Sequence, residues 1–296
     1  MTKAPEIPSA ALPGGVSMPL LGFGTWRLRG SAGFEAVRTA LQVGYRHLDT
    51  ATMYGNEAEV GHALRDSGLD RSEVFITTKL PPGKAGQERK TLCASLRALG
   101  TTHVDLWLVH WPPPARALAP VWREFLALRD EGLARTVGVS NYSLTQIDTL
   151  IKATGAAPAV NQIPWSPAQY DEAVLQESRE RGVTLEGYSP LKGTDLGHPV
   201  LTGIAEKHGK SDAVAQDDFR RRDDASVLTL GKHDATPGLA RRGLELLEPI
   251  HVFPLSPVED GAGMGRRIVV IRKDLLPAPR ACPYPLKPIL RKRQTP

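Results

Sequence analysis

The chain has 296 residues, of which 41% are hydrophobic and 23% charged, and these values are typical of a globular protein with a sizeable core. No run of about 18 apolar residues occurs, so we expect no membrane-spanning helix. The net charge of +5 comes from the end of the chain, where nine Lys and Arg residues face one acidic residue after position 263. This leaves about −3 on the rest and gives no reason to expect nucleic-acid binding.

Features at the chain's beginning and its cysteine content indicate the compartment. Residues 1–15 are rich in Pro and Ala and contain no apolar stretch, so they do not resemble a signal peptide. The two cysteines, Cys93 and Cys282, are too few for a disulfide framework and fit a reducing compartment. We therefore expect a cytoplasmic protein.

Short apolar runs alternate with amphipathic segments over the first 210 residues. We expect strands at residues 20–25, 47–49, 74–80, 104–110, 136–139, 159–163 and 183–188. Each is followed by a predicted helix, at residues 32–43, 56–67, 87–99, 119–131, 144–153, 171–181 and 199–208, and Ser143 is the predicted N-cap of the fifth. Continuous apolar strands alternating with such helices indicate a parallel sheet covered by helices.

Seven βα units in tandem favour a closed (β/α)8 TIM barrel over an open sheet. No GxGxxG fingerprint follows an early strand, which argues against a Rossmann fold. Gly22 and Gly24 lie inside the first predicted strand, where we expect them to allow close packing and not to hold a phosphate.

Polar and aromatic residues occupy the carboxyl end of nearly every predicted strand. In a parallel barrel these ends meet at one face, and the chemistry of such proteins lies there. The residues at this position are Thr25-Trp26, Asp49 to Tyr54, Lys79, His110-Trp111, Ser140-Asn141, Gln162 and Tyr188-Ser189.

The barrel brings Asp49, Tyr54, Lys79 and His110 toward one point. A tyrosine with an ordinary pKa of about 10 is a poor acid near neutrality, and a nearby ammonium that is held by a carboxylate lowers that pKa. The group thus offers a proton donor for a developing alkoxide and an imidazole N–H for a carbonyl oxygen. No Ser-His-Asp order or nucleophile elbow occurs, so acyl transfer is not indicated.

A metal hydrolase is an alternative interpretation of the same strand ends. His47 shares a strand face with Asp49, and in this interpretation both join His110 around a metal ion. No His-x-His pair supports this interpretation, and we predict no metal site.

Several stretches resemble the motifs of the aldo-keto reductase family, over residues 16–210. The family's first signature is similar to Asp49-Thr50-Ala51-x-x-Tyr54-Gly55-Asn56-Glu57. The rest of its tetrad resembles Lys79 in Thr77-Thr78-Lys79-Leu80 and His110 in Leu108-Val109-His110-Trp111-Pro112. Its nicotinamide-side motifs are similar to Gly138-Val139-Ser140-Asn141-Tyr142, Val160-Asn161-Gln162 and Gly187-Tyr188-Ser189-Pro190-Leu191. Within the family, the chain resembles the bacterial 2,5-diketo-D-gluconate reductases.

This resemblance implies a (β/α)8 barrel that binds NADPH at the strand ends and reduces a small aldehyde or ketone, with Tyr54 as proton donor. It also implies a monomer and places His47 in the barrel packing. The implied carboxamide contacts are Ser140, Asn141 and Gln162, and Tyr188 would stack on the nicotinamide ring. The remaining implied cofactor contacts are Ser189, Leu191 and Lys232, and the implied substrate contacts are Trp26 and Trp111. Which carbonyl compound is reduced does not follow from the sequence.

The resemblance stops after Ser211. Residues 227–237, which include Lys232, weakly match the family's eighth strand and lysine loop, and residues 268–271 are a second candidate strand. Arg241 and Arg242 lie near, but not at, the expected position of the arginine that binds the 2′-phosphate. We therefore expect a barrel over residues 1–260, degenerate from 211, and a basic, Pro-rich and poorly ordered tail over 261–296.

Two interpretations of this departure remain open, a shifted reading frame after residue 211 and a genuine extension. Either way we expect an eighth βα unit that is degenerate or incomplete, an open sheet edge and weak NADPH binding. A different class of function also follows, in which a catalytically weak barrel binds nicotinamide nucleotide as a sensor or partner-binding subunit.

Overall fold

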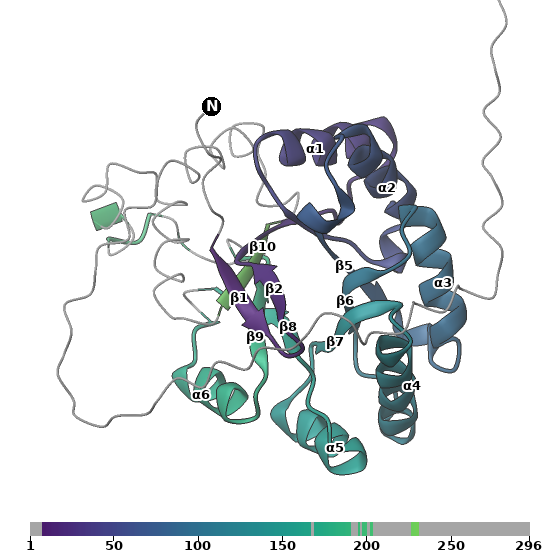
Figure 1. Cartoon of the computed structure of the whole chain (residues 1–296). Coiled ribbons are helices and arrows are strands. Elements are labelled where there is room, and N and C mark those ends of the chain that lie inside the picture. The colour runs from purple at the N-terminus through teal and green to yellow at the C-terminus, as the bar shows by residue number, and fades with distance from the viewer. Residues whose placement is uncertain are drawn as a thin grey trace, which may run out of the picture.

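The computed structural model describes residues 8–166, 169–190, 195, 197–199 and 202–203, together with the backbone of 226–230. Eight parallel strands close into one barrel in the order β10-β3-β4-β5-β6-β7-β8-β9 (Figure 1). The strands are β3 (Leu21–Gly24), β4 (His47–Asp49), β5 (Phe75–Leu80), β6 (Val104–Val109), β7 (Ala134–Ser140), β8 (Val160–Pro164), β9 (Thr184–Tyr188) and β10 (Ser226–Leu230). The predicted (β/α)8 barrel and its first seven strands are confirmed.

The strand β10 closes the barrel. It pairs in parallel with β9 on one side and with β3 on the other, so that Leu228 lies opposite both Gly187 and Leu21. The expectation of an open sheet edge is therefore wrong, because the ladder uses main-chain N–H and C=O groups that almost any sequence supplies. This strand is the first of the two segments that the sequence offered; the second, residues 268–271, lies outside the described residues, as does any helix after β10.

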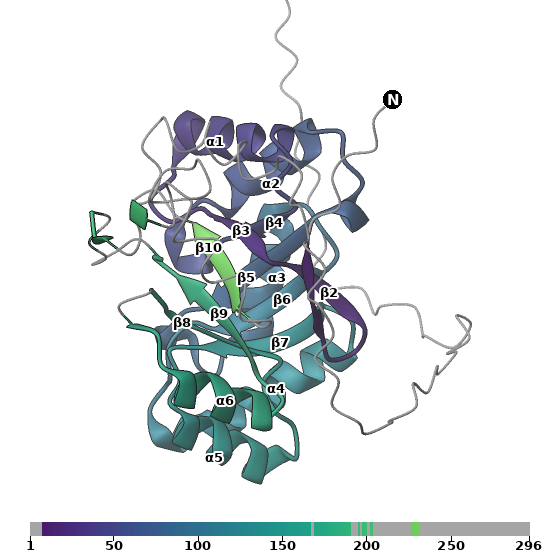
Figure 2. The same ribbon diagram turned by 90° about the vertical axis from the view of Figure 1, so that its left-hand side faces the viewer.

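Among the described residues, six helices alternate with the strands from β3 to β9 and cover that part of the barrel's outer face (Figures 1 and 2). They are α1 (Gly30–Gln42), α2 (Glu57–Asp66), α3 (Glu88–Leu99), α4 (Leu118–Asp130), α5 (Leu144–Thr154) and α6 (Glu172–Glu180). Short 3₁₀ turns are η1 (Thr52–Tyr54), η2 (Arg71–Glu73), η3 (Pro82–Lys84) and η4 (Ala115–Ala117). The largest apolar cluster lies between strands and helices, where the Trp107 ring of β6 stacks on Phe125 of α4 with centroids 3.8 Å apart.

The predicted helix boundaries agree with these bounds to within two residues over α1 to α6. Ser143 caps α5 as expected, since its hydroxyl accepts from the Gln146 N–H while the Gln146 side chain accepts from the Ser143 N–H. The expected helix at 199–208 lies mostly outside the described residues.

A hairpin that the sequence analysis did not predict precedes the barrel. Strands β1 (Ser9–Leu12) and β2 (Val16–Pro19) pair antiparallel, and Figure 2 shows them at one end of the barrel strands. Leu12, Val16 and Met18 pack in one apolar cluster with residues of β5, β6 and β8. The hairpin therefore covers the amino-terminal end of the barrel. Four-residue strands carry too little periodicity to predict, although Gly14 and Gly15, both at positive φ, were a turn signal.

Gly22 makes room for a histidine inside the barrel. A Cβ on Gly22 would lie 2.9 Å from Nδ1 of His47, so close packing is the reason for a glycine here, as expected. His47 is fully buried, and its ring nitrogens face the Pro19 carbonyl at 3.4 Å and the Thr77 hydroxyl at 3.0 Å.

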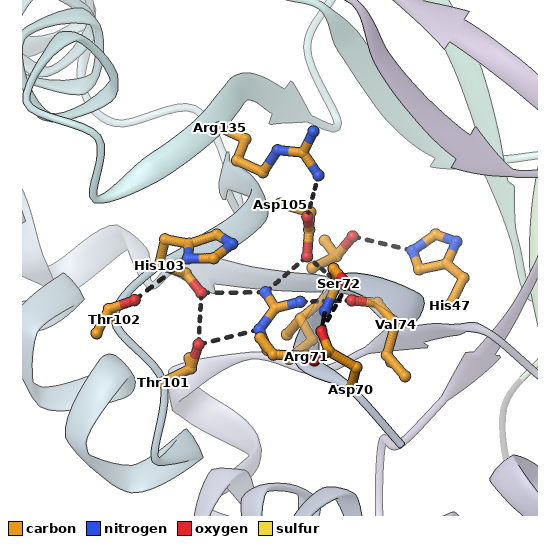
Figure 3. A network of polar contacts seen from close by, with 12 residues as sticks. His47, Asp70, Arg71, Ser72, Val74, Thr101, Thr102, His103, Asp105 and Arg135 are labelled. Carbon is orange, nitrogen blue, oxygen red and sulfur yellow. Dashed lines mark hydrogen bonds and ion pairs between the residues drawn. The ribbon is translucent and has the colours of Figure 1, made fainter. Parts of the chain in front are cut away.

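A buried carboxylate organises the amino-terminal end of the barrel (Figure 3). Asp105 of β6 accepts hydrogen bonds from Arg71 at 2.6 Å, Arg135 at 3.1 Å and the Ile76 N–H at 2.9 Å. Arg71 also donates to the carbonyls of Val74 and His103 and to the Thr101 hydroxyl. We call these groups the Asp105 network; it joins η2, β5, β6 and β7.

Two further points concern the compartment. Within the described part of the chain, no helix is long and apolar enough to cross a membrane. Cys93 lies buried in α3 and is disulfide-bonded, which differs from the expectation of reduced cysteines.

Candidate active site

The four candidate catalytic residues lie together at the carboxyl end of the barrel. Asp49 ends β4, Lys79 lies near the end of β5, and His110 follows β6 directly. Lys79 Nζ donates to Asp49 Oδ1 at 2.5 Å and to the Thr50 carbonyl at 2.9 Å. The same Nζ lies 5.3 Å from the centroid of the Tyr54 ring, and the Tyr54 and His110 centroids are 5.7 Å apart. A cation, a phenol and an imidazole thus meet above one carboxylate.

The turn that carries Tyr54 is held by Asn56. The Asn56 amide donates to the Thr25 and Leu28 carbonyls at 2.7 Å each, and its oxygen accepts from the Thr50 hydroxyl at 3.0 Å. The sequence indicated that Asn56 opens a helix, and α2 does begin at the next residue. Its side chain makes no capping bond, however, and instead ties the loop after β3 to the loop after β4.

A second polar group lies behind Lys79. The Glu57 carboxylate accepts from Thr78 at 2.6 Å and from Ser95 at 3.0 Å, and burial raises its pKa. The Thr52 hydroxyl bonds Ser95 at 3.1 Å and donates to the Lys79 carbonyl at 3.0 Å. These bonds tie η1 and α2 to β5 and α3, and no pattern in the sequence predicts them.

Burial and charge set the protonation of the site. Burial raises the pKa of Tyr54, and the Lys79 ammonium opposes this without reversing it, so the sequence-based expectation of a lowered pKa does not hold for the net direction. Burial is the largest single influence on Lys79 and works against its ammonium, but the combined effects of Asp49, Tyr54 and Glu186 outweigh it, so the pKa of Lys79 is raised. Burial, together with the Lys79 charge, lowers the pKa of His110 to about 3. At neutral pH the site therefore contains a phenol, an ammonium and a neutral imidazole.

The residues expected at the cofactor form one hydrogen-bonded string at the ends of β7, β8 and β9. The Tyr188 hydroxyl donates to Asn141 Oδ1 at 2.8 Å, and the Asn141 amide donates to the His110 carbonyl and the Ser140 hydroxyl, both at 3.0 Å. Ser140 Oγ donates to the Gln162 carbonyl at 2.8 Å. The Gln162 amide then donates to Asp49 Oδ2 at 2.8 Å, a contact that the sequence analysis did not foresee.

The backbone is strained at these same ends. Asn141 has φ of 64°, which Asn tolerates better than most residues, and Ser189, after β9, has φ of 50°. Such conformations occur often at binding sites, where surrounding structure enforces them. The two remaining expected cofactor contacts, Leu191 and Lys232, lie outside the described residues.

The side chains at this edge fit a nicotinamide ring with its carboxamide. Asn141 Oδ1, Ser140 Oγ and the Gln162 amide each retain hydrogen-bonding capacity beyond the bonds given above. At the same end, Thr25 Oγ1 and His110 Nδ1 are buried without a hydrogen-bond partner. Buried polar atoms of this kind are costly unless another molecule satisfies them.

The residues expected at the substrate are exposed. Trp26 is 43% and Trp111 46% exposed, and with Met53 at 54% they are the exposed large hydrophobic residues of the described chain. All three follow the carboxyl ends of barrel strands, and the Arg27 guanidinium lies 4.4 Å from the Trp26 ring centroid. Met53 was absent from the sequence-based set, although it directly precedes Tyr54 in the quoted signature.

The metal-hydrolase interpretation is not supported by His47. Its two ring nitrogens already face Pro19 and Thr77, and burial lowers its pKa to about 4. Among the described residues, no group of three or more His, Cys, Asp or Glu side chains is arranged to hold a metal ion.

Comparisons with known proteins identify the family of the chain. A sequence model described as "Aldo/keto reductase family" matches residues 20–224. An aldo-keto reductase of Mycobacterium sp. (strain JLS) is 42% identical over 212 residues, which cover 70% of this chain and 77% of that protein. A morphine 6-dehydrogenase of Pseudomonas putida is 38% identical over 227 residues, with 71% and 77% covered.

Solved structures are similar as well. A crystal structure of an aldo/keto reductase from Brucella melitensis superimposes with a TM-score of 0.77 at 34% identity, covering 85% of this chain and 96% of that one. The aldose reductase of Schistosoma japonicum gives a TM-score of 0.72 at 29% identity, with 84% and 89% covered.

Proposed function

The chain belongs to the aldo/keto reductase family, and from that premise we propose that it reduces a small aldehyde or ketone to an alcohol with NADPH, using Tyr54 as proton donor. The observation that carries this proposal is the Asp49–Lys79 ion pair, which lies beneath the phenol ring of Tyr54 and beside a neutral His110.

In the proposed reaction Tyr54 keeps its proton until it is needed. Burial raises its pKa, so the phenol is protonated at neutral pH. When bound, the reduced nicotinamide would supply a hydride to the carbonyl carbon, and the carbonyl oxygen would then carry the negative charge of an alkoxide. Tyr54 gives its proton to that oxygen, and the nearby Lys79 ammonium stabilises the phenolate that remains. Asp49 holds the ammonium in place through a 2.5 Å bond.

His110 orients the substrate in this proposal. With its pKa lowered to about 3, the imidazole is neutral and carries one N–H that can point at the carbonyl oxygen. Trp26 and Trp111 would contact the rest of the substrate, because both are large, apolar and exposed after strands that end at the carboxyl end of the barrel.

The cofactor would lie along the string at β7 to β9. Ser140, Asn141 and Gln162 would bond the carboxamide, and the Tyr188 ring, fixed by its hydroxyl bond to Asn141, would stack on the nicotinamide. We further propose Ser189, Leu191 and Lys232 as cofactor contacts. The choice of NADPH over NADH rests on the family resemblance alone.

Oxidation of NADPH by an activated aromatic aldehyde tests the function, with wild type compared to Tyr54→Phe. We expect turnover in the wild type and a loss of about 10³-fold in the variant, within the usual contribution of a general acid. Turnover that survives the substitution would refute Tyr54 as the acid. Nucleotide binding without turnover in either protein would instead favour the alternative, a catalytically weak barrel that acts as a sensor or partner-binding subunit. The departure from the family motifs after Ser211 is the observation behind this alternative.

Weak NADPH affinity remains part of the proposal, because the expected 2′-phosphate arginine has no counterpart at its spacing. Quenching of protein fluorescence by added NADPH measures it. A dissociation constant near or below about 1 μM would contradict the expectation.

We also propose a monomer that works in the cytoplasm, without a nucleic-acid partner. A content of two cysteines is unlike the disulfide-dense domains of oxidising compartments. The disulfide at Cys93 argues against a cytoplasmic location, since cytoplasmic thiols stay reduced. Acid quenching of intact cells followed by alkylation of the denatured protein, read by mass spectrometry, should label both cysteines if the location is right, and sedimentation gives the oligomeric state.

A further inference from the structure

The Gln162 side chain is directly bonded to the carboxylate that holds Lys79. Its amide nitrogen donates to Asp49 Oδ2 at 2.8 Å, across the barrel from β8 to β4. Lys79 Nζ donates to the other carboxylate oxygen, Asp49 Oδ1, at 2.5 Å. Gln162 and Asp49 are each 3% exposed and Lys79 is 0% exposed. Each of the two carboxylate oxygens therefore has one protein donor in a place that water does not reach.

Gln162 is itself rigidly placed. Its main-chain carbonyl oxygen accepts hydrogen bonds from the Ser140 hydroxyl at 2.8 Å and from the Asn141 main-chain N–H at 2.9 Å. The amide thus starts from a backbone position that is fixed from two sides, and its reach to Asp49 leaves the carboxylate little freedom to turn. A hydrogen bond to a buried ionised group contributes more than one between neutral groups, because the low local dielectric strengthens it.

The bond also completes a continuous path. From the Tyr188 hydroxyl, hydrogen bonds run through Asn141 and Ser140 to Gln162, and from there to Asp49 and Lys79. One end of this path is the proposed cofactor edge and the other is the ion pair under Tyr54.

We infer that Gln162 is a positioning residue for the Asp49–Lys79 pair, in addition to any contact with the cofactor, and that it links the cofactor edge to the proton donor. The catalytic consequence rests on the proposed function; the positioning of Lys79 does not. One side-chain N–H of Gln162 donates to Asp49, and the side-chain carbonyl oxygen, Oε1, is still able to accept a hydrogen bond from a carboxamide NH₂. A cofactor bound there would then act on the ion pair through a single side chain.

The test of positioning uses the cofactor-free protein. A buried, hydrogen-bonded lysine ammonium exchanges its protons slowly and gives an ¹⁵N-correlated proton signal. The signal that disappears in Lys79→Met is assigned to Lys79. In Gln162→Met, which keeps the volume but removes the donor, we expect exchange about tenfold faster, as for losing one bond to an ionised group. Ser140→Ala, which leaves the Asp49 bond intact, should retain slow exchange. An unchanged Lys79 signal in folded Gln162→Met overturns the inference.

The catalytic test separates positioning from cofactor binding. In single turnovers at saturating NADPH, Gln162→Met should lower the hydride-transfer rate about tenfold, whereas Ser140→Ala should act mainly on the dissociation constant of NADPH. A Gln162→Met variant that changes only cofactor affinity contradicts the inference. If the wild type turns over no carbonyl compound, the proposed function fails, and the Lys79 signal still decides the positioning role. Gln162→Glu, which replaces the donor by a carboxylate, should impair both readouts as well.

Discussion

Two buried carboxylates lie at opposite ends of the same barrel, and their partners differ. Asp105, at the amino-terminal end, is bonded by two guanidinium groups and a main-chain N–H. Asp49, at the carboxyl end, is bonded by a lysine and an amide side chain, with a phenol and an imidazole close by. A guanidinium does not release its proton in proteins, whereas an ammonium beside a phenol can stabilise the phenolate that proton donation leaves. Burial of an ion pair therefore does not by itself mark a catalytic site, and the proposed difference between the two ends is the phenol of Tyr54 close to Lys79.

The backbone differs between the two ends in the same sense. The non-glycine residues with positive φ in the described chain are Arg27, Asn141 and Ser189, with φ of 65°, 64° and 50°. Each follows or ends a strand at the carboxyl end. The Asp105 network, in contrast, joins residues in ordinary conformations. Strain that is confined to one end agrees with a structural role for the other.

Replacing Lys79 by Met should show the largest effect. Without the ammonium the phenolate of Tyr54 is no longer stabilised, and we expect the rate of carbonyl reduction to fall by about 10³-fold. Lys84, exposed on η3 and outside the site, provides the control, since Lys84→Met should keep the wild-type rate. Steady-state kinetics at saturating NADPH measure both variants. A Lys79→Met protein with more than about a tenth of wild-type activity would remove the proposed distinction between the two ends.

Asp105→Asn should act on stability and not on the rate. The substitution leaves Arg71 without its carboxylate and places an amide against the Ile76 N–H, so we expect the free energy of unfolding to fall by about 2–4 kcal/mol. Urea denaturation measures the change, and activity per folded molecule should stay within about twofold of wild type. The exposed Arg129–Asp130 pair is the control, because Asp130→Asn should cost at most about 1 kcal/mol.

Acid should weaken the barrel through His47, which lies inside it near the hairpin end. Burial lowers its pKa to about 4. Between pH 6.5 and 4, His47 is therefore protonated in the unfolded chain but mostly neutral in the folded chain. Stability therefore falls as the pH drops through this window, by about 2 kcal/mol between pH 6.5 and 5. His47→Gln should reduce this slope, whereas the exposed His62→Gln should not. Equal slopes in all three proteins, from urea curves at both pH values, would contradict the assignment.

Trp111→Ala should have the smallest effect. The side chain is 46% exposed, so its loss should leave stability nearly unchanged. We expect the KM for an aromatic aldehyde to rise about three- to tenfold, the value of one aromatic contact, with little change in kcat. A short aliphatic aldehyde is the matched control and should respond less. An effect as large on the aliphatic substrate would place Trp111 outside the substrate contact.

Much of the fold follows from the sequence because strands such as β5 and β6 are buried along their whole length, and they appear as short segments rich in β-branched and apolar residues. Lys79 and His110 were recognisable for a related reason, since each is a polar group where such a run ends. The closure by β10 did not follow, because main-chain pairing with β3 and β9 depends little on side chains.

Other features depend on quantities that the sequence does not contain. The bond from Gln162 to Asp49 joins residues 113 positions apart and requires the relative heights of β8 and β4 across the barrel. The net direction of the Tyr54 pKa depends on whether burial exceeds the effect of Lys79, and that balance is set by packing. Asn56 was expected only as the first residue of a helix, whereas its side chain bonds the carbonyls of Thr25 and Leu28 in another loop.

The hairpin of β1 and β2 gives the molecule a practical polarity. Because it lies across the amino-terminal end of the barrel, a linker joined ahead of residue 8 leaves from the face opposite Tyr54. An affinity tag or surface anchor attached there would hold the molecule on a bead or electrode with its reactive face toward the solution. The same placement suits a fusion to a cofactor-regenerating enzyme, since the joined partner would not stand in front of the strand ends.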